Sequence, residues 1–181
     1  NATDITENQT TDKTGVSANE TYNLADGVTW TVGDKTNQWG LFNNNTVLGE
    51  NASLSLNASG NGDINAAIGE GGATIDVDTL KITSQEYAIY QSFSSANPIS
   101  IKANTINIKA GAESAIYNSS GNDIRITDFD TLTVESSSEA AIKITEGTAS
   151  ISGNTVNLTS DGASALNTHG SSSVSIKANT I

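Results

Sequence analysis

A short motif, in which threonine or serine is followed by an apolar residue, any residue and a second apolar residue, recurs along the chain. The copies are Ser53–Leu56, Thr79–Ile82, Thr105–Ile108, Thr131–Val134 and Thr155–Leu158, followed by Thr180–Ile181. They begin 26, 26, 26, 24 and 25 residues apart, and one further step back from Leu54 reaches Val28. A period between about 20 and 50 residues is typical of repeat architectures, so the chain is expected to coil and not to form a globule.

Two further apolar columns keep the same period. The second column places a small residue before an apolar one, and the third column reads apolar, any residue, apolar. Copies of the second column begin at Gly40, Ala67, Ala88, Ala115, Ala141 and Ala165, and copies of the third begin at Ile75, Ile99, Ile124, Ala149 and Val174. Alternation of period two indicates short β-strands, and the Gly, Asn, Asp and Ser residues between them favour tight corners.

Three strands and three corners in about 25 residues correspond to one rung of a triangular coil. Each strand would pair in parallel with the equivalent strand of the next rung, about 4.8 Å away. Parallel β connections are right-handed in nearly all cases. The sequence therefore predicts an all-β fold, a right-handed parallel β-helix with three strands per rung and roughly six to seven rungs.

The period divides the chain into two parts. Residues 1–26 are polar, acidic and poor in apolar residues, which is typical of a flexible leader or of a cap that includes Tyr22 and Leu24. Residues 27–181 carry the repeat and are expected to form the solenoid. Because Ile181 falls inside a repeat unit, and an open solenoid end exposes unpaired strand edges, we expect the solenoid to be truncated at its C-terminus.

Composition excludes several kinds of partner and chemistry. The net charge of −12 disfavours nucleic acid and anionic membranes, which are bound by clustered Lys and Arg. The chain has no cysteine, so it can form neither a disulfide nor a thiolate metal site. It also lacks a run of 18 apolar residues, so no segment is expected to cross a membrane as a helix.

Paired carboxylates are the first candidates for catalysis, because glycoside hydrolysis needs two of them. Asp78 and Asp130 lie in one column two rungs apart, which corresponds to roughly 9.6 Å, the outer edge of the range for inverting enzymes. The same column, directly before the threonine motif, reads Asp78, Asn104, Asp130, Asn154 and Asn179. Corner residues, or a ladder of side-chain hydrogen bonds between rungs, explain this column better, and we predict that the chain is not an enzyme.

Metal and cofactor sites are not predicted either. Residues 60–64, Gly-Asn-Gly-Asp-Ile, resemble half of a glycine-rich calcium repeat, but that motif binds ions in tandem copies and occurs once here. His169 is the single histidine and has no second nitrogen or sulfur ligand in the sequence. We therefore expect no cofactor and no metal, and a glycine-rich corner at residues 60–64.

Outward-facing columns are the remaining place for a binding surface. Phe42, Tyr90 and Tyr117 follow the apolar residue of the second column, so they should point outward, and the two tyrosines should stack on adjacent rungs. Such tyrosines either stabilise the sheet or form a contact surface for proteins or sugars. Asn107 and Asn157 occupy the outward position of the threonine motif. These five residues are the predicted surface contacts.

Other aromatic residues are expected to protect the core. Trp30 and Trp39 are predicted to close the N-terminal end over the first rung. Phe93 and Phe129 are expected at corners, where they would cover the core from outside.

Residues 27–181 resemble the passenger regions of Gram-negative autotransporter adhesins, which use type V secretion. The resemblance is carried by residues 100–108 (Ser-Ile-Lys-Ala-Asn-Thr-Ile-Asn-Ile), by residues 150–158 (Ser-Ile-Ser-Gly-Asn-Thr-Val-Asn-Leu) and by the small–apolar–aromatic column. It implies a β-helix at the bacterial cell surface, tethered to the outer membrane by a C-terminal barrel that is absent from this chain. The passenger itself would not be inserted in the membrane.

The repeat and the resemblance together predict a cell-surface adhesin. A straight rod repeats weak contacts along its length, and such contacts add through multivalency. We expect attachment, auto-aggregation or biofilm formation, with a host or bacterial surface protein, a glycan or a second copy as partner. The alternatives are a β-helix protein that binds or cleaves polysaccharides, and a passive surface stalk.

Overall fold

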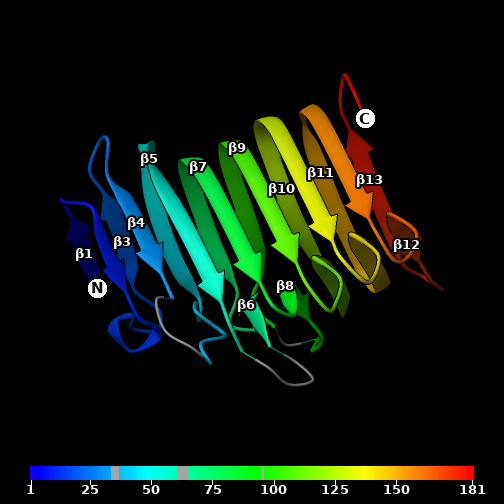
Figure 1. Ribbon diagram of the computed structural model, residues 1–181, viewed down its shortest axis with the longest axis horizontal. Helices are drawn as coiled ribbons and strands as arrows, with labels where there is room; N and C mark the ends of the chain where they lie inside the picture. Colours follow the sequence, from blue (N-terminus) through cyan, green and yellow to red (C-terminus); the bar gives the residue numbers. More distant parts are fainter. Residues whose placement is uncertain (34–36, 61–64, 95) are drawn as a thin grey trace.

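The computed structural model describes residues 1–33, 37–60, 65–94 and 96–181, and 64% of it is β-strand (Figure 1). One 3-10 turn, Lys13–Gly15, interrupts the strands near the N-terminus. The strands are β1 Ala2–Ile5, β2 Gln9–Thr11, β3 Thr21–Leu24, β4 Thr29–Val32, β5 Asn45–Ala58, β6 Ala66–Ile68, β7 Ala73–Ser84, β8 Tyr87–Gln91, β9 Ile99–Ala110, β10 Ile116–Ser136, β11 Ile142–Ser160, β12 Leu166–Thr168 and β13 Ser173–Lys177.

The strands form a parallel β-solenoid of about 6 turns, with equivalent residues about 25 positions apart. The main path of hydrogen-bonded strands runs β1-β3-β5-β7-β9-β10-β11-β12. Figure 1 shows these strands side by side, with the N-terminus and the C-terminus at opposite ends. The predicted fold class, an all-β three-strand solenoid, is confirmed.

Three faces surround the core. The first face contains the threonine motif: β2, β4 and residues 53–58, 79–84, 105–110, 131–136 and 155–160. The second face contains β6, β8, β12 and residues 116–118 and 142–144. The third face contains β1, β3, β13 and residues 45–49, 73–77, 99–103, 123–127 and 148–152.

Apolar columns hold the rungs in register. In the first face, Leu80, Ile106 and Leu132 lie opposite one another on consecutive rungs, and each is fully buried. The residues between the inward positions face solvent, so the alternation of the motif matches the alternation of the pleated strand. A shift of one residue would turn every inward side chain outward, which is why the apolar columns fix the register.

The N-terminal 26 residues are part of the sheet. β1 pairs with β3, β3 pairs with β5, and β2 pairs with β4, all in parallel. Ile5, Tyr22 and Leu24 are buried in the same core as the later rungs. The flexible leader, one of the two alternatives for this segment, does not agree with these strands, whereas the other alternative already included Tyr22 and Leu24 in an ordered cap. A few apolar residues at alternating positions are enough here, because neighbouring strands supply the backbone hydrogen bonds.

The column before the threonine motif forms the expected hydrogen-bonded ladder over three rungs. The Asn154 amide donates to the Asp130 carboxylate at 3.0 Å, and the Asn179 amide donates to Asn154 Oδ1 at 2.8 Å. Asp78 accepts from the neighbouring Thr79 hydroxyl at 3.2 Å. These carboxylates lie at an exposed corner of the coil, as the structural interpretation of the column predicted.

Two aromatic residues lie deeper than the sequence suggested. Trp30 belongs to β4 between β2 and β5, with its ring 4.6 Å from that of Tyr22 and its indole N–H donating to Thr11 Oγ1. It is therefore part of the interior and does not close the end of the coil. Phe129 is also buried, because Gly153 on the next rung leaves space for it. A Cβ atom on Gly153 would lie 2.3 Å from the Phe129 ring.

A buried polar corner joins the second and third faces. Asn118 is fully buried, and its amide donates to the carbonyls of Asn122 at 2.6 Å and of Thr148 at 3.0 Å. Its Oδ1 accepts from the backbone N–H and the hydroxyl of Ser120. On the preceding rung, the buried Gln91 donates to the Asn97 carbonyl at 2.6 Å. These side chains satisfy backbone groups where the strands leave the regular ladder.

Candidate binding surfaces

The five predicted contact residues do not form one site. Asn107 and Asn157 are exposed on the first face, in the same column, with Thr133 between them. Tyr90 and Tyr117 lie opposite each other on the second face and are half-buried. Phe42 lies inside the coil. The structure therefore offers two separate surfaces.

The prediction that Phe42 points outward is wrong. Its side chain is 2% exposed, and Phe42 pairs with Ile68, so it occupies the inward column. The sequence pattern had placed the preceding residue, Leu41, in that column. Left-handed backbone at Gly40 and Asn44, each with φ of 57°, bends the chain on both sides of this segment. Leu41 and Phe42 are both buried as a result, which strict alternation cannot give.

A tyrosine cluster, made of Tyr87, Tyr90 and Tyr117, covers part of the second face. The rings of Tyr90 and Tyr117 are stacked, with centroids 5.1 Å apart and planes at 9°, as predicted. Tyr87 was missed by the sequence analysis. Its ring lies 4.6 Å from that of Tyr90 and 5.4 Å from that of Tyr117. The sequence could have indicated Tyr87 by its position, since it lies three residues before Tyr90 and directly before the buried Ala88 and Ile89.

Two phenols of the cluster, those of Tyr87 and Tyr90, have raised pKa values. Burial raises the pKa of the Tyr87 hydroxyl well above its ordinary value of 10.0, and the neighbouring Glu113 carboxylate adds to this effect. Burial also raises the pKa of Tyr90. A deprotonated phenol would place a negative charge among aromatic rings and next to carboxylates, which is unfavourable.

We expect alkaline destabilisation that depends on Tyr87. Its folded pKa lies above its unfolded pKa, so its contribution to stability is complete below pH 10 and is lost as the pH rises through the folded pKa. The free energy of unfolding, measured with urea from about pH 9 to pH 11, should therefore fall with pH. Tyr87→Phe should make this fall shallower. An equally steep fall in the variant would contradict the prediction.

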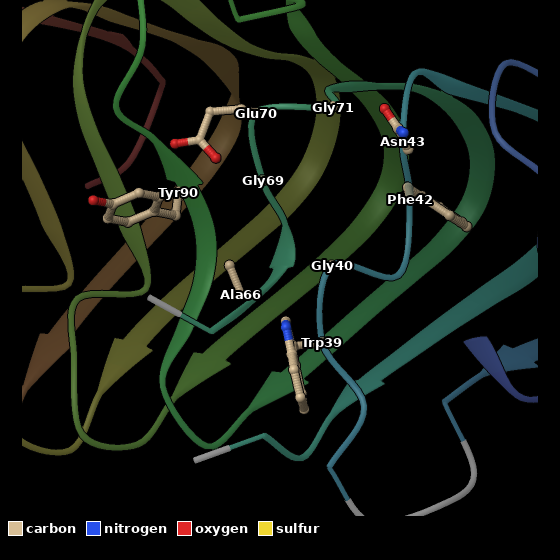
Figure 2. Close-up of a pocket in the computed structure, with 9 residues that line it drawn as sticks. All are labelled: Trp39, Gly40, Phe42, Asn43, Ala66, Gly69, Glu70, Gly71 and Tyr90. Atoms are coloured by element: carbon tan, nitrogen blue, oxygen red, sulfur yellow. The ribbon is translucent and has the colours of Figure 1, made fainter. Parts of the chain in front are cut away.

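A pocket of about 300 Å³ adjoins the tyrosine cluster (Figure 2). It is lined by Trp39, Gly40, Phe42, Asn43, Ala66, Gly69, Glu70, Gly71 and Tyr90. Trp39 is 39% exposed, so it does not close the core as predicted, and the Lys13 ammonium lies 5.4 Å from the centroid of its ring. Glu70 accepts hydrogen bonds from the backbone N–H of Ser92, at 3.1 Å, and from its hydroxyl. The sequence analysis did not identify Glu70.

The outward side of the first face, here called the polar face, is the second surface. Its outward positions from Thr29 to Thr159 carry Thr, Ser and Asn, with three charged residues, Lys81, Lys109 and Glu135. Two lysines and one glutamate give this surface a formal charge of +1, whereas the whole chain carries −12. The strands below it are in continuous register from β4 to β11. The polar face is thus regular and nearly neutral.

The remaining candidates for catalysis or metal binding are acidic side chains outside these two surfaces. On the third face, the Asp123 carboxylate accepts from the hydroxyls of Thr148 and Ser150 and pairs with Arg125 at 3.0 Å. Over the described ranges, no group of three His, Asp or Glu side chains is placed to hold a metal ion. The calcium-like sequence at residues 60–64 lies largely outside the described residues, which include Gly60 alone.

Comparisons with known proteins leave the family open. No family model, no curated protein and no solved structure matches the chain. Within the part of the chain that the structure covers, no helix has the length and apolar character needed to span a membrane.

Proposed function

We propose that this chain is the adhesive part of a bacterial cell-surface protein, and that it associates with other surfaces through the polar face. The observation that carries the proposal is the regular, nearly neutral array of Thr, Ser and Asn side chains over continuous parallel rungs. Each rung presents a similar set of donors and acceptors. Weak contacts repeated at a fixed spacing add up when two such rods lie side by side.

Charge supports the choice of this face. Two copies, each with a net charge of −12, repel one another over most of their surface. The polar face, with a formal charge of +1, is a region where two copies can approach without that penalty. Threonine and asparagine side chains there can both donate and accept hydrogen bonds, so a second copy can satisfy them in either direction.

The proposal includes the location and the absence of catalysis. The protein would act at the outer membrane surface, as the resemblance to autotransporter passengers implies, and would not turn over a substrate. Asp78 and Asp130, the residues first considered for hydrolysis, belong to the corner column, where Asp130 already accepts a hydrogen bond from Asn154. A ladder residue of this kind needs no catalytic explanation.

Self-association can be measured on the 181-residue chain by sedimentation velocity at several concentrations. We expect the sedimentation coefficient of the wild type to rise with concentration. Asn107→Glu combined with Asn157→Glu puts like charges on the polar face two rungs apart and should weaken association at least tenfold, because like-charge contacts across an interface are unfavourable.

The matched control carries the same change of charge on another face. Ser100 and Ser175 are exposed on the third face, so Ser100→Glu with Ser175→Glu should leave association unchanged. Bacteria that display the full-length protein should clump, and a deletion strain should not. A chain that stays monomeric at every concentration, together with cells that do not clump, would refute the proposal.

A further inference from the structure

The pocket beside the tyrosine cluster exists because one side chain is missing from an outward column. The alignment of this column on the second face follows from the pairing of Phe42 with Ile68, of Ile68 with Ile89, and of the later strands. On successive rungs the column contains Asn43, Gly69, Tyr90, Tyr117, Lys143 and Asn167. Gly69 has no side chain to place between Asn43 and Tyr90. We call the resulting gap the Gly69 slot.

The width of the slot follows from the rung spacing. Asn43 and Tyr90 are two rungs apart, which corresponds to about 9.6 Å. A six-membered ring in van der Waals contact on both sides, at about 3.5–4.0 Å per contact, needs about 7–8 Å. The two rungs therefore leave room for one ring between Asn43 and Tyr90. A Cβ atom built on Gly69 would have no neighbour nearer than the Tyr90 carbonyl oxygen at 3.9 Å, so the space is open.

Aromatic surface forms one wall of the slot and part of its rim. One side of the Tyr90 ring stacks on Tyr117, and Tyr90 lines the pocket from the rung next to that of Gly69. Figure 2 shows Tyr90 on one side of Gly69, Asn43 on the other, and Trp39 at the end of the pocket near Gly40. The apolar C–H face of a sugar ring packs on aromatic faces of this kind, with the hydroxyl groups directed outward.

Two polar groups in the slot have unused hydrogen-bonding capacity. Glu70 Oε1 accepts from Ser92, whereas Oε2 accepts no hydrogen bond from any residue that the structure describes. The side-chain amide of Asn43 likewise has no hydrogen bond to the described residues. Asn43 can pack closely against Gly71, since a Cβ there would lie 2.6 Å from Asn43 Oδ1. A carboxylate that accepts and an amide that also donates complement the hydroxyl groups of a sugar.

Charge selects among sugars. Glu70 would repel a carboxylate or sulfate group in the slot, and the net charge of −12 would disfavour acidic polysaccharides more generally. The pocket volume of about 300 Å³ lies at the lower end of the range for small-ligand sites, which suits a single residue of a glycan.

We propose that the Gly69 slot binds a neutral pyranose residue of a glycan, stacked on Tyr90 and hydrogen-bonded to Glu70 and Asn43. This site lies on the second face, so it is separate from the polar face and does not depend on self-association. The chain would then bind a glycan on the second face, in addition to the protein–protein contacts proposed for the polar face.

The test uses the purified 181-residue chain and a panel of methyl glycosides of glucose, galactose, mannose and N-acetylglucosamine, with glucuronic acid and N-acetylneuraminic acid as charged counterparts. Binding is followed by saturation-transfer NMR and by tryptophan fluorescence, since Trp39 lines the pocket whereas Trp30 is buried. We expect saturable binding of at least one neutral glycoside and weaker binding of both acids.

Variants then locate the site. Gly69→Leu fills the slot and should weaken binding at least tenfold, and Glu70→Gln, which keeps the shape but removes the charge, should weaken it about tenfold. Asn167→Leu places the same side chain in the same column, away from the slot, and should bind like the wild type. Circular dichroism checks that each variant is folded.

Two results would overturn the proposal. One is that no neutral glycoside in the panel binds the wild type, and the other is that a folded Gly69→Leu variant binds as well as Asn167→Leu does. Because the slot lies on the second face, and self-association through the polar face is measured separately by sedimentation, failure of one proposal does not imply failure of the other.

Discussion

Replacing Asn118 by alanine is expected to lower the free energy of unfolding by about 3–5 kcal/mol. Asn118 is fully buried and hydrogen-bonds to the backbone carbonyls of Asn122 and Thr148 and to Ser120. Truncation would remove these hydrogen bonds, and that of the Ser120 hydroxyl, at a corner where Asn118 and Ser120 are buried and Asn122 and Thr148 are partly buried. Each unsatisfied buried group costs about 1–3 kcal/mol, and small shifts of the backbone would recover part of the loss.

The matched control is Asn107→Ala, the same substitution at an exposed position of the first face. It should change the free energy of unfolding by no more than about 0.5 kcal/mol. Urea titrations followed by circular dichroism would give both values. If the two variants were equally stable, the hydrogen bonds of the corner would contribute nothing measurable, and the interpretation of the buried polar corner would be wrong.

The period of the sequence was sufficient to predict the solenoid, because every rung repeats the same physical requirement. Leu80, Ile106 and Leu132 must point inward on consecutive strands, and alternation then sends their neighbours outward. The outward placement of Asn107 and Asn157 and the stacking of Tyr90 on Tyr117 follow from the same rule. Where the backbone keeps the regular pleat, the sequence pattern is enough.

Predictions failed where the backbone departs from that pleat. The left-handed residues Gly40 and Asn44 allow Leu41 and Phe42 to be buried together, so Phe42 changed from a predicted contact to a core residue. At the N-terminus, Ile5 and Leu24 lie on strands too short and too polar to reveal a period. Their burial depends on the pairing of β1 with β3 and of β3 with β5, which lies further along the chain and is not visible in the local sequence.

The Gly69 slot shows a different limit. Sequence reasoning searches for side chains that could bind, whereas this pocket is created by a side chain that is absent. Glu70 looks like an ordinary corner residue in the sequence. Its value as a ligand group depends on Gly69 and on the position of Tyr90, on the neighbouring rung. Such a site becomes visible only when the columns are aligned in three dimensions.

Truncation of a central core residue is expected to be the other large effect. Ile106→Ala should lower the free energy of unfolding by about 3 kcal/mol. Ile106 is fully buried between Leu80 and Leu132, so its truncation would leave a cavity that the paired rungs on both sides cannot close. For a chain of this size, that loss corresponds to a fall in Tm of about 6–12 °C. Calorimetry or thermal circular dichroism would measure it.

The loss in free energy of unfolding should depend on where along the solenoid the truncated residue lies. Ile176 on β13 has one neighbour in its column, Ile151, and is partly exposed, so Ile176→Ala should cost about half as much as Ile106→Ala. In a solenoid each rung is stabilised by the rungs on both sides, whereas a globular core would show no such gradient along the chain. Equal losses at the two positions would contradict the expected dependence on burial and on neighbouring rungs.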